Sequence, residues 1–346
     1  MKIIMMKTLK ERILFFFLLA FSINSCENSV DPDDWKMNPN IVLIKLSYEG
    51  IIGGNYKINV WNNDNIYSAT GYVRHIKINT DFKVVGDSII ENTFENFLFT
   101  YLTINEAGNK ILLVGSNFTN VSAGALYELN LESNQLTLLK NNVHNISSAV
   151  YLNNNDDECI YYSYGNETNN IVPGYYHLNI ETVSDSLILP HTSDLGYYIY
   201  AEFVNGFDLS PDNKKLIIPI HRANLPAKMA FYDFESKQLD TLDIEFNDQF
   251  VWFRYNKTGD QILFCSYPWV VGGSRANAPS EIGIIDTNTF SLRMLDVKTN
   301  GFLSMSLFPS WSSDDKHIVL GSAPGPAQEP PGAVGTYSIY ILKNVN

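Results

Sequence analysis

The residue types that most often carry chemistry occur in this 346-residue chain without forming a known catalytic motif. The six histidines stand far apart in the sequence, and none of them belongs to an HExxH pattern. The stretch 272–276 (GGSRA) lacks the closing glycine of a nucleophile elbow. No Walker loop, GxGxxG loop or EF-hand loop occurs. We therefore predict no catalytic residue, no cofactor and no metal site, although single residues brought together by the fold would leave no linear motif.

Binding chemistry matches the sequence better, because aromatic and basic side chains gather in long loops rich in glycine and proline. Aromatic side chains offer a large contact area at a low entropic cost, and arginine pairs with carboxylates or sulfates. The candidate ligand-binding residues are Tyr197, Tyr198, His221, Arg222, Tyr267, Trp269 and Arg275. The alternative is that these aromatics cap the hydrophobic ends of the fold and that the arginines bridge neighbouring loops.

Two cysteines of the chain body, Cys159 and Cys265, fall in different repeats, so we expect no disulfide between them. No CxxC motif or Cys/His pair has the spacing of a metal site. Both are expected to be small core residues. The acid-rich segments 153–158 (NNNDDE) and 312–317 (SSDDKH) are expected to be ordinary hairpin turns and not calcium sites.

Five segments share one signature, a polar turn followed by an apolar strand. The turns start at Asn105, Asn153, Ser210, Asn256 and Ser312, at separations of 46 to 57 residues. Six positions after each start, three consecutive apolar residues predict a strand buried on both faces. A second hairpin follows most copies, as in Leu129–Leu136. One repeat therefore comprises four strands, and no sustained helical periodicity occurs after residue 40.

Four-stranded units at this spacing are typical of a β-propeller. The segments 207–216 (FDLSPDNKKL) and 309–318 (PSWSSDDKHI) resemble the TolB-like, WD40-type propeller repeat. The resemblance covers roughly residues 41–346 and implies an all-β fold of four-stranded antiparallel blades. TolB proteins also carry an α/β domain ahead of the propeller, for which this sequence leaves no room. The resemblance therefore implies a fold and a compartment more than a mechanism.

Counting strands predicts six blades. A degenerate unit fits residues 56–90, and the last unit lacks a fourth strand. Placing the segment 41–46 (IVLIKL) beside 337–342 completes the last blade and covers a bare strand edge. Five or seven blades remain open as alternatives. In this arrangement the long loops share one face, opposite the tight turns, and we predict the binding site on the long-loop face.

The N-terminus is typical of an export signal. Four basic residues precede an apolar run from Ile13 to Ile23, which is too short to span a bilayer. Cys26, directly after Ser25, resembles the lipobox cysteine of bacterial lipoproteins, which implies cleavage before Cys26 and its lipidation. The expected organisation is a signal peptide at 1–25, a lipidated cysteine with an acidic tether at 26–40, and a propeller at 41–346. An ordinary secretory signal with an incidental cysteine is the alternative.

Composition narrows the function classes further. The chain has 37 acidic against 24 basic residues and a net charge of −13, which argues against nucleic acid and against an anionic lipid surface as partners. We expect a monomeric, non-catalytic binding module of the bacterial cell envelope, anchored in the outer membrane through Cys26 and facing the periplasm or the cell surface. Its partner would be a protein or a polysaccharide. The alternative is a propeller enzyme, a polysaccharide lyase or a lactonase-like hydrolase, with a metal or catalytic site at the central channel.

Overall fold

The computed structural model describes residues 42–50, 58–69, 73–90, 97–117, 120–152, 154–191, 206–222, 225–246, 250–267, 281–295, 305–323, 337–343 and 345. All of them belong to the unit Met37–Asn346. The expected signal peptide at 1–25, Cys26 and the tether at 26–40 lie outside the described residues. No helix in the described part of the chain is long and apolar enough to cross a membrane.

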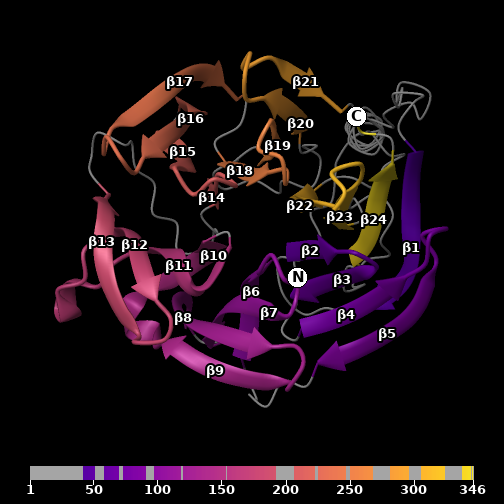
Figure 1. Ribbon diagram of the computed structural model, residues 1–346, viewed down its shortest axis with the longest axis horizontal. Coiled ribbons are helices and arrows are strands. Elements are labelled where there is room, and N and C mark those ends of the chain that lie inside the picture. The colour runs from indigo at the N-terminus through magenta and orange to yellow at the C-terminus, as the bar shows by residue number, and fades with distance from the viewer. Residues whose placement is uncertain are drawn as a thin grey trace, which may run out of the picture. The chain divides into compact units, whose positions relative to one another are not determined.

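The described strands form six four-stranded antiparallel sheets, arranged as the blades of a propeller (Figure 1). Each of the first three blades consists of four consecutive strands. Blade I contains β2 (Ile58–Asn62), β3 (Asn65–Ala69), β4 (Val73–Ile78) and β5 (Val84–Ile90). Blade II contains β6 (Phe97–Ile104), β7 (Lys110–Asn117), β8 (Asn120–Asn130) and β9 (Gln135–Lys140). Blade III contains β10 (Ile146–Leu152), β11 (Asn155–Ser163), β12 (Gly174–Asn179) and β13 (Ser184–Pro190).

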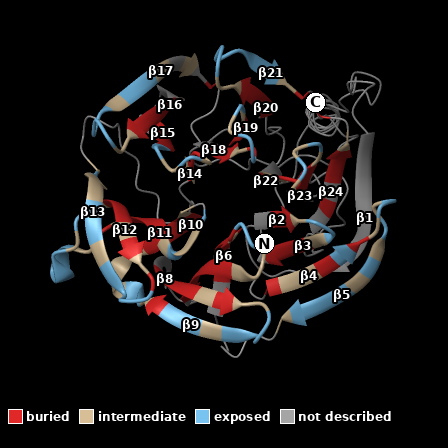
Figure 2. Ribbon diagram, viewed as in Figure 1, coloured by how far each residue is buried: buried red, intermediate tan, exposed pale blue. Residues whose placement is uncertain are grey.

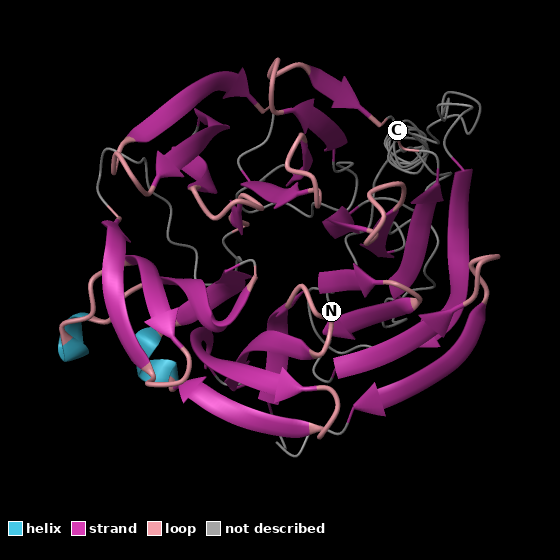
Figure 3. Cartoon of the chain, in the orientation of Figure 1, coloured by secondary structure: helices cyan, strands magenta, loops and turns pink. Residues whose placement is uncertain are grey.

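The next two blades repeat this order, and helix is confined to two short 3-10 turns among the described residues (Figure 3). Blade IV contains β14 (Asp208–Leu209), β15 (Lys215–Arg222), β16 (Leu225–Asp233) and β17 (Leu239–Glu245). Blade V contains β18 (Phe250–Tyr255), β19 (Gln261–Tyr267), β20 (Glu281–Asp286) and β21 (Leu292–Met294). The 3-10 turns are η2 (Asn142–His144) and η3 (Glu167–Asn169).

The sixth blade closes the ring with the first strand of the chain. It contains β22 (Met305–Trp311), β23 (Ile318–Ala323) and β24 (Tyr337–Lys343), with β1 (Val42–Gly50) paired antiparallel to β24. The register places Ile44 opposite Ile341 and Leu46 opposite Ile339. The predictions of six blades and of closure by the N-terminal strand are confirmed. This pairing covers the edge that β24 would otherwise present.

Buried apolar residues form clusters that join neighbouring blades. Figure 2 shows that the buried residues concentrate in the inner strands of the blades, whereas the outer strands β5, β9, β13, β17 and β21 are largely exposed or intermediate. In β7, Ile111, Leu112, Leu113 and Val114 are all at most 1% exposed, as expected of a strand buried on both faces. Separate clusters lie between blades III and IV, between blades IV and V, and between blades VI and I. Cys159 and Cys265 are both buried, as predicted.

Candidate functional site

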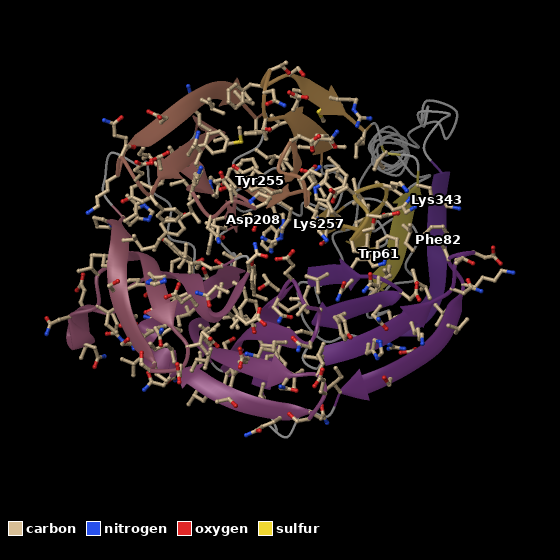
Figure 4. The ribbon with its side chains drawn as sticks, in the orientation of Figure 1. Trp61, Phe82, Asp208, Tyr255, Lys257 and Lys343 are labelled. Atoms are coloured by element: carbon tan, nitrogen blue, oxygen red, sulfur yellow. The ribbon has the colours of Figure 1, made fainter. Side chains whose placement is uncertain are left out.

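A cavity of about 710 Å³ lies at the inner end of the ring, where the turns between the first and second strands of the blades converge. Every blade contributes to its lining. The polar and charged lining includes Asn62 and Asn63 from blade I, Glu106 from II, Asn154 from III, Asp208 from IV, Arg254 and Lys257 from V, and Asp314 and Asp315 from VI. We call it the channel-mouth cavity. Figure 4 shows Asp208, Tyr255 and Lys257 at the inner edge of the ring.

The repeated turn signature explains how the polar side chains come to line this cavity. At the turn starts, the side chains of Asn105, Ser210, Asn256 and Ser312 accept a hydrogen bond from the backbone N–H five residues later, at 2.9–3.0 Å. Three residues after each start the backbone has a positive φ, at Gly108, Asn213, Gly259 and Asp315. Glycine, asparagine and aspartate tolerate this conformation best, so the turn chemistry selects short polar residues.

Neighbouring turns are joined to one another around the rim. The Asp315 carboxylate of blade VI accepts hydrogen bonds from the backbone N–H groups of Lys257 and Thr258 in blade V, at 2.9 and 3.3 Å. Between blades II and III, the Asn105 side-chain amide donates to Asp156 at 2.8 Å. These contacts hold neighbouring turns in place around the cavity.

The third copy of the signature departs from the others. Asn155 pairs directly with Leu152, so β11 begins earlier than its apolar run and the turn is tighter than its counterparts. Asn154, in the left-handed region at φ 59°, occupies this turn and lines the cavity. The turn predicted at 312–317 agrees with the pairing of Trp311 with Ile318. At 153–158 the prediction is only partly right, because residues 155–158 belong to β11.

Arg254 forms the floor of the channel-mouth cavity. Its side chain is buried, and its guanidinium donates to the Phe207 carbonyl at 3.0 Å and to the Tyr101 hydroxyl at 2.7 Å. Tyr101 belongs to blade II and Arg254 to blade V, so this hydrogen bond joins blades on opposite sides of the ring. The guanidinium also lies 4.3 Å from the ring centre of Trp252, within cation–π range.

Asp208 balances the charge of Arg254. One carboxylate oxygen lies 3.7 Å from the guanidinium, and the other accepts a hydrogen bond from the Tyr255 backbone N–H at 2.8 Å. The side chain of Asp208 is only 16% exposed. Burial raises the pKa of this carboxyl above its usual value, because the charged form is poorly solvated, while Arg254 and the backbone N–H groups oppose the shift. A carboxyl of raised pKa in a cavity is a recognised mark of a functional site.

Carboxylates also crowd at the lip of the cavity in blades V and VI. Burial raises the pKa of Asp315, and the nearby charges of Asp260 and Asp314 add to the shift. The Asp314 carboxylate accepts a hydrogen bond from Ser312 at 2.6 Å and lies 3.7 Å from the Lys316 ammonium. In the described part of the chain, no group of three or more histidine, cysteine or acidic side chains is placed to hold a metal ion.

Where blade I meets blade VI, one member of an aromatic cluster, Trp61, lines the cavity. The Trp61 indole lines the cavity and stacks against the His317 ring, with centroids 6.0 Å apart. Phe82 packs edge-on against both rings, and the Lys343 ammonium lies 4.2 Å from the centre of the Phe82 ring (Figure 4). The junction that closes the ring is therefore also part of the site.

None of the residues selected from the sequence has a described side chain. Tyr197, Tyr198, Trp269 and Arg275 lie outside the described residues, as does Cys26. His221, Arg222 and Tyr267 end the second strands β15 and β19, and their side chains are likewise outside the described set. Their role in binding remains a prediction.

The structure describes the loop Gly165–Gly174, which connects β11 and β12. It contains η3 and is tied to the linker before blade III, since Asn145 donates to the Gly165 carbonyl at 2.6 Å and Asn166 to the Val143 carbonyl at 3.0 Å. The loop is thus anchored at its base by side-chain amides. Its described contacts are structural.

Sequence reasoning missed Arg254 and Asp208. Arg254 stands in the apolar run Phe250–Tyr255, and an arginine inside an inner strand signals a buried partner. Asp208 precedes the turn in one of the two repeat copies that resemble a propeller repeat. Their spatial proximity across blades IV and V has no linear signature.

Comparison with known proteins gives a fold and no family. No family model matches the sequence, and no curated protein matches it. Similar solved structures include TolB from Acinetobacter baumannii, at 15% identity and a TM-score of 0.53, covering 85% of this chain and 66% of that one. An oligogalacturonate lyase in complex with manganese is similar at 11% identity and 0.52, covering 84% and 78%. A chain of a nidogen/laminin complex is similar at 6% identity and 0.54, covering 76% and 89%.

At these identities the likeness establishes the architecture. Propellers host many unrelated functions, and function resides in the particular site that each one carries. The expectation of a TolB-like propeller fold is confirmed by the ring of six blades and by the TolB structure among the neighbours.

Proposed function

We propose that this chain is a lipid-anchored propeller of the bacterial cell envelope that binds a partner, a protein or a polysaccharide, in the channel-mouth cavity without transforming it. The observation that carries the proposal is the cavity itself, which draws residues from all six blades. Its volume of about 710 Å³ falls in the range of known ligand sites, roughly 300–1,000 Å³.

Two further observations support binding over chemistry. The rim turns are held by hydrogen bonds from blade to blade, and the floor by Arg254, so little entropy is lost when a ligand enters. The sequence also lacks the linear motifs of the common hydrolases and nucleotide-binding enzymes.

The anchor rests on the sequence alone. The basic start, the short apolar run and Cys26 would place the propeller on a membrane through a lipid. Labelled palmitate should be incorporated in the wild type and lost in Cys26→Ala. Palmitate incorporation in both proteins would show that Cys26 is not the lipid anchor, and it would leave the proposed binding site unaffected.

The binding site is tested by filling the cavity. Ala107 lines it from the exposed turn of blade II, so Ala107→Trp should obstruct it. Ser133→Trp is the matched control, because Ser133 is exposed in the turn between β8 and β9 and does not line the cavity. Partners recovered from envelope extracts should be lost with Ala107→Trp and retained with Ser133→Trp.

The long-loop face is the competing location. The pair Trp269→Ala and Arg275→Ala should leave capture unchanged if the channel-mouth cavity is the site. Loss of capture in this pair, with full capture by Ala107→Trp, would move the site to the face predicted from loop length.

A propeller enzyme is the second candidate. Its supporting observation is Asp208, a carboxyl of raised pKa that lines the cavity beside Arg254 and could exchange a proton with a ligand. An oligogalacturonate lyase in complex with manganese shares the fold. A stoichiometric divalent metal in the purified protein, or turnover of a polysaccharide or lactone that Asp208→Asn abolishes, would favour the enzyme. Unaltered ligand recovered from the cavity would favour binding.

A further inference from the structure

We propose that the channel-mouth cavity binds a neutral oligosaccharide, the end or a short stretch of an uncharged polysaccharide. This ligand rests on the binding function proposed above and decides between its two classes of partner. Three features of the lining support it: polar groups that have no partner in the protein, carbon surface from aromatic rings beside them, and the way the charges are distributed.

Five polar side chains of the lining make no hydrogen bond or ion pair within the part of the chain that the structure describes. Each comes from a different blade: Asn62 from blade I, Glu106 from II, Asn154 from III, Lys257 from V and Ser310 from VI. Other lining amides are already used in the rim, as where Asn105 donates to Asp156 and Asn256 to Asp260. The five groups therefore surround the cavity with hydrogen-bonding capacity that a ligand can use.

These five groups include both donors and acceptors. The Lys257 ammonium only donates and the Glu106 carboxylate only accepts, whereas the amides of Asn62 and Asn154 and the hydroxyl of Ser310 do both. A purely anionic ligand would satisfy the donors alone, and a purely cationic one the acceptors alone. A hydroxyl group donates and accepts, so a ligand with hydroxyls around its edge can pair with all five. The edge of a sugar ring has this chemistry.

The aromatic lining suits the faces of such a ring. Trp61 and Trp311 both line the cavity. The Trp61 indole N–H donates to the Asn63 carbonyl at 2.6 Å, and that of Trp311 to the Arg254 carbonyl at 3.3 Å. Because both N–H groups are used inside the protein, the rings offer carbon surface to the cavity. The faces of a sugar ring carry C–H groups, which pack favourably against the electron-rich face of an aromatic ring.

The charges of the protein favour an uncharged ligand over the alternatives. The buried charges at the floor, Asp208 and Arg254, pair with each other, and the free charges of Glu106 and Lys257 are opposite in sign. The net charge of −13 disfavours a polyanionic glycan. An extended peptide binds mainly through main-chain hydrogen bonds along an open strand edge, whereas the free groups here are side chains of five separate blades.

The test uses four neutral hexasaccharides as probes: maltohexaose, cellohexaose, mannohexaose and xylohexaose. Hexagalacturonate is the anionic counterpart of the same length. Binding is followed by calorimetry and by tryptophan fluorescence, since Trp61 and Trp311 line the cavity. At least one neutral probe should bind with an affinity that is nearly independent of salt, and hexagalacturonate should not bind. Failure of all four neutral probes, or equal binding of hexagalacturonate, would overturn the inference.

A double variant, Asn62→Ala with Asn154→Gly, removes the free amides of blades I and III. Glycine keeps the positive φ of 59° at position 154, so the turn is preserved. The bound hexasaccharide should bind about tenfold more weakly, because two hydrogen bonds to it are lost. Glu106→Ala, a single change in an exposed turn, should weaken binding about threefold and tests the same point if the double variant fails to fold.

The matched control is Asn134→Gly with Asn288→Ala. Asn134 also has a positive φ, of 55°, and both residues are exposed in turns outside the cavity lining. This control should bind the hexasaccharide as the wild type does. Equal weakening in the two double variants, or unchanged affinity in both Asn62→Ala with Asn154→Gly and Glu106→Ala, would overturn the inference.

The filled-cavity variant separates this inference from the proposed function. Loss of both hexasaccharide binding and partner capture in Ala107→Trp supports the two together. If Ala107→Trp abolishes capture and the captured partner is a protein without glycan, the binding function stands and the saccharide ligand is wrong. If Ala107→Trp leaves capture unchanged, the proposed binding site itself is wrong.

Discussion

Replacing Arg254 with methionine should be among the most destabilising single changes in this propeller. Methionine preserves much of the aliphatic volume but removes the guanidinium, with its bonds to Tyr101 and Phe207 and its contact with Trp252. It also leaves the buried Asp208 carboxylate without its cation. Breaking one side of a buried ion pair costs about 3–5 kcal/mol, a large share of the roughly 5–15 kcal/mol that stabilise a folded domain.

A double-mutant cycle isolates the ion pair. Asp208→Asn keeps an oxygen that can accept from the Tyr255 N–H, so it should cost less than Arg254→Met, about 1–2 kcal/mol. The combined variant should be more stable than the sum of the single effects predicts, by a coupling energy of about 1–3 kcal/mol. Urea unfolding followed by tryptophan fluorescence measures all three, since Trp252 lies against Arg254.

The pH dependence provides an independent check. Asp208 has a raised pKa in the folded protein, and loss of Arg254 removes a charge that opposes this rise. A group with a raised folded pKa contributes stability at low pH that is lost as the pH rises through that pKa. The deficit of Arg254→Met should therefore be largest at pH 8 and shrink towards pH 5, and Asp208→Asn should abolish this trend.

The reasoning is refuted by additivity. If the two single effects sum to that of the double variant within about 0.5 kcal/mol, Asp208 and Arg254 are not coupled. Arg254→Lys serves as the conservative comparison, because it keeps the charge but not the planar donor geometry that reaches Tyr101 and Phe207 together. It should fall between the wild type and Arg254→Met.

Three further predictions concern the turns, the closure and the histidines. Gly108→Ala should lower the free energy of unfolding more than Gly259→Ala does, although both glycines have a φ near +75°. A Cβ atom at Gly108 would lie 1.6 Å from the Asn62 amide nitrogen, whereas one at Gly259 would lie 3.1 Å from Pro211. Equal costs of about 1–2 kcal/mol in both variants would indicate that backbone strain alone is responsible. Deleting Val42–Gly50 removes β1 and exposes the edge of β24. The truncated protein should lose its cooperative thermal transition or form aggregates that size-exclusion chromatography detects. A monomer with an unchanged melting temperature would contradict closure of the ring by β1. Burial lowers the pKa of His75, His144 and His317 below 6.5, so the stability that these residues contribute is present above that pH and is lost as the pH falls through their folded pKa values. The urea midpoint of unfolding should therefore drop between pH 7 and pH 5, and it should drop less when these histidines are replaced by glutamine. An unchanged midpoint would contradict the assigned pKa shifts.

Much of the fold follows from local sequence patterns. The apolar run Ile111–Val114 must be buried on both faces wherever it lies, and the turn that precedes it needs a residue with positive φ at Gly108. Such features depend on neighbours in the chain, so they recur in each repeat and can be read from it. The unpaired segment at 41–46 even predicts the closure, because a strand edge requires a partner.

The candidate site was less accessible to this reasoning. Loop length is a local property, and it directed attention to the long-loop face and to Trp269 and Arg275. The channel-mouth cavity is built by tight turns that look ordinary one at a time. Glu106 and Asp314 carry no signal in their own repeats, since any exposed turn accepts an acidic residue.

The sequence by itself determined the repeat, the blade and its turns, and the acidic character of the protein, and it favoured six blades over five or seven. Only the tertiary structure decided which side chains of the different blades meet at the axis of the ring. Tyr101 and Arg254 are separated by 153 positions, and their hydrogen bond exists only because the closed ring places blade II opposite blade V. Ring closure also sets which alternate residues of each inner strand face the channel, and it places Arg254, an arginine in an apolar strand, in the lining of the channel-mouth cavity.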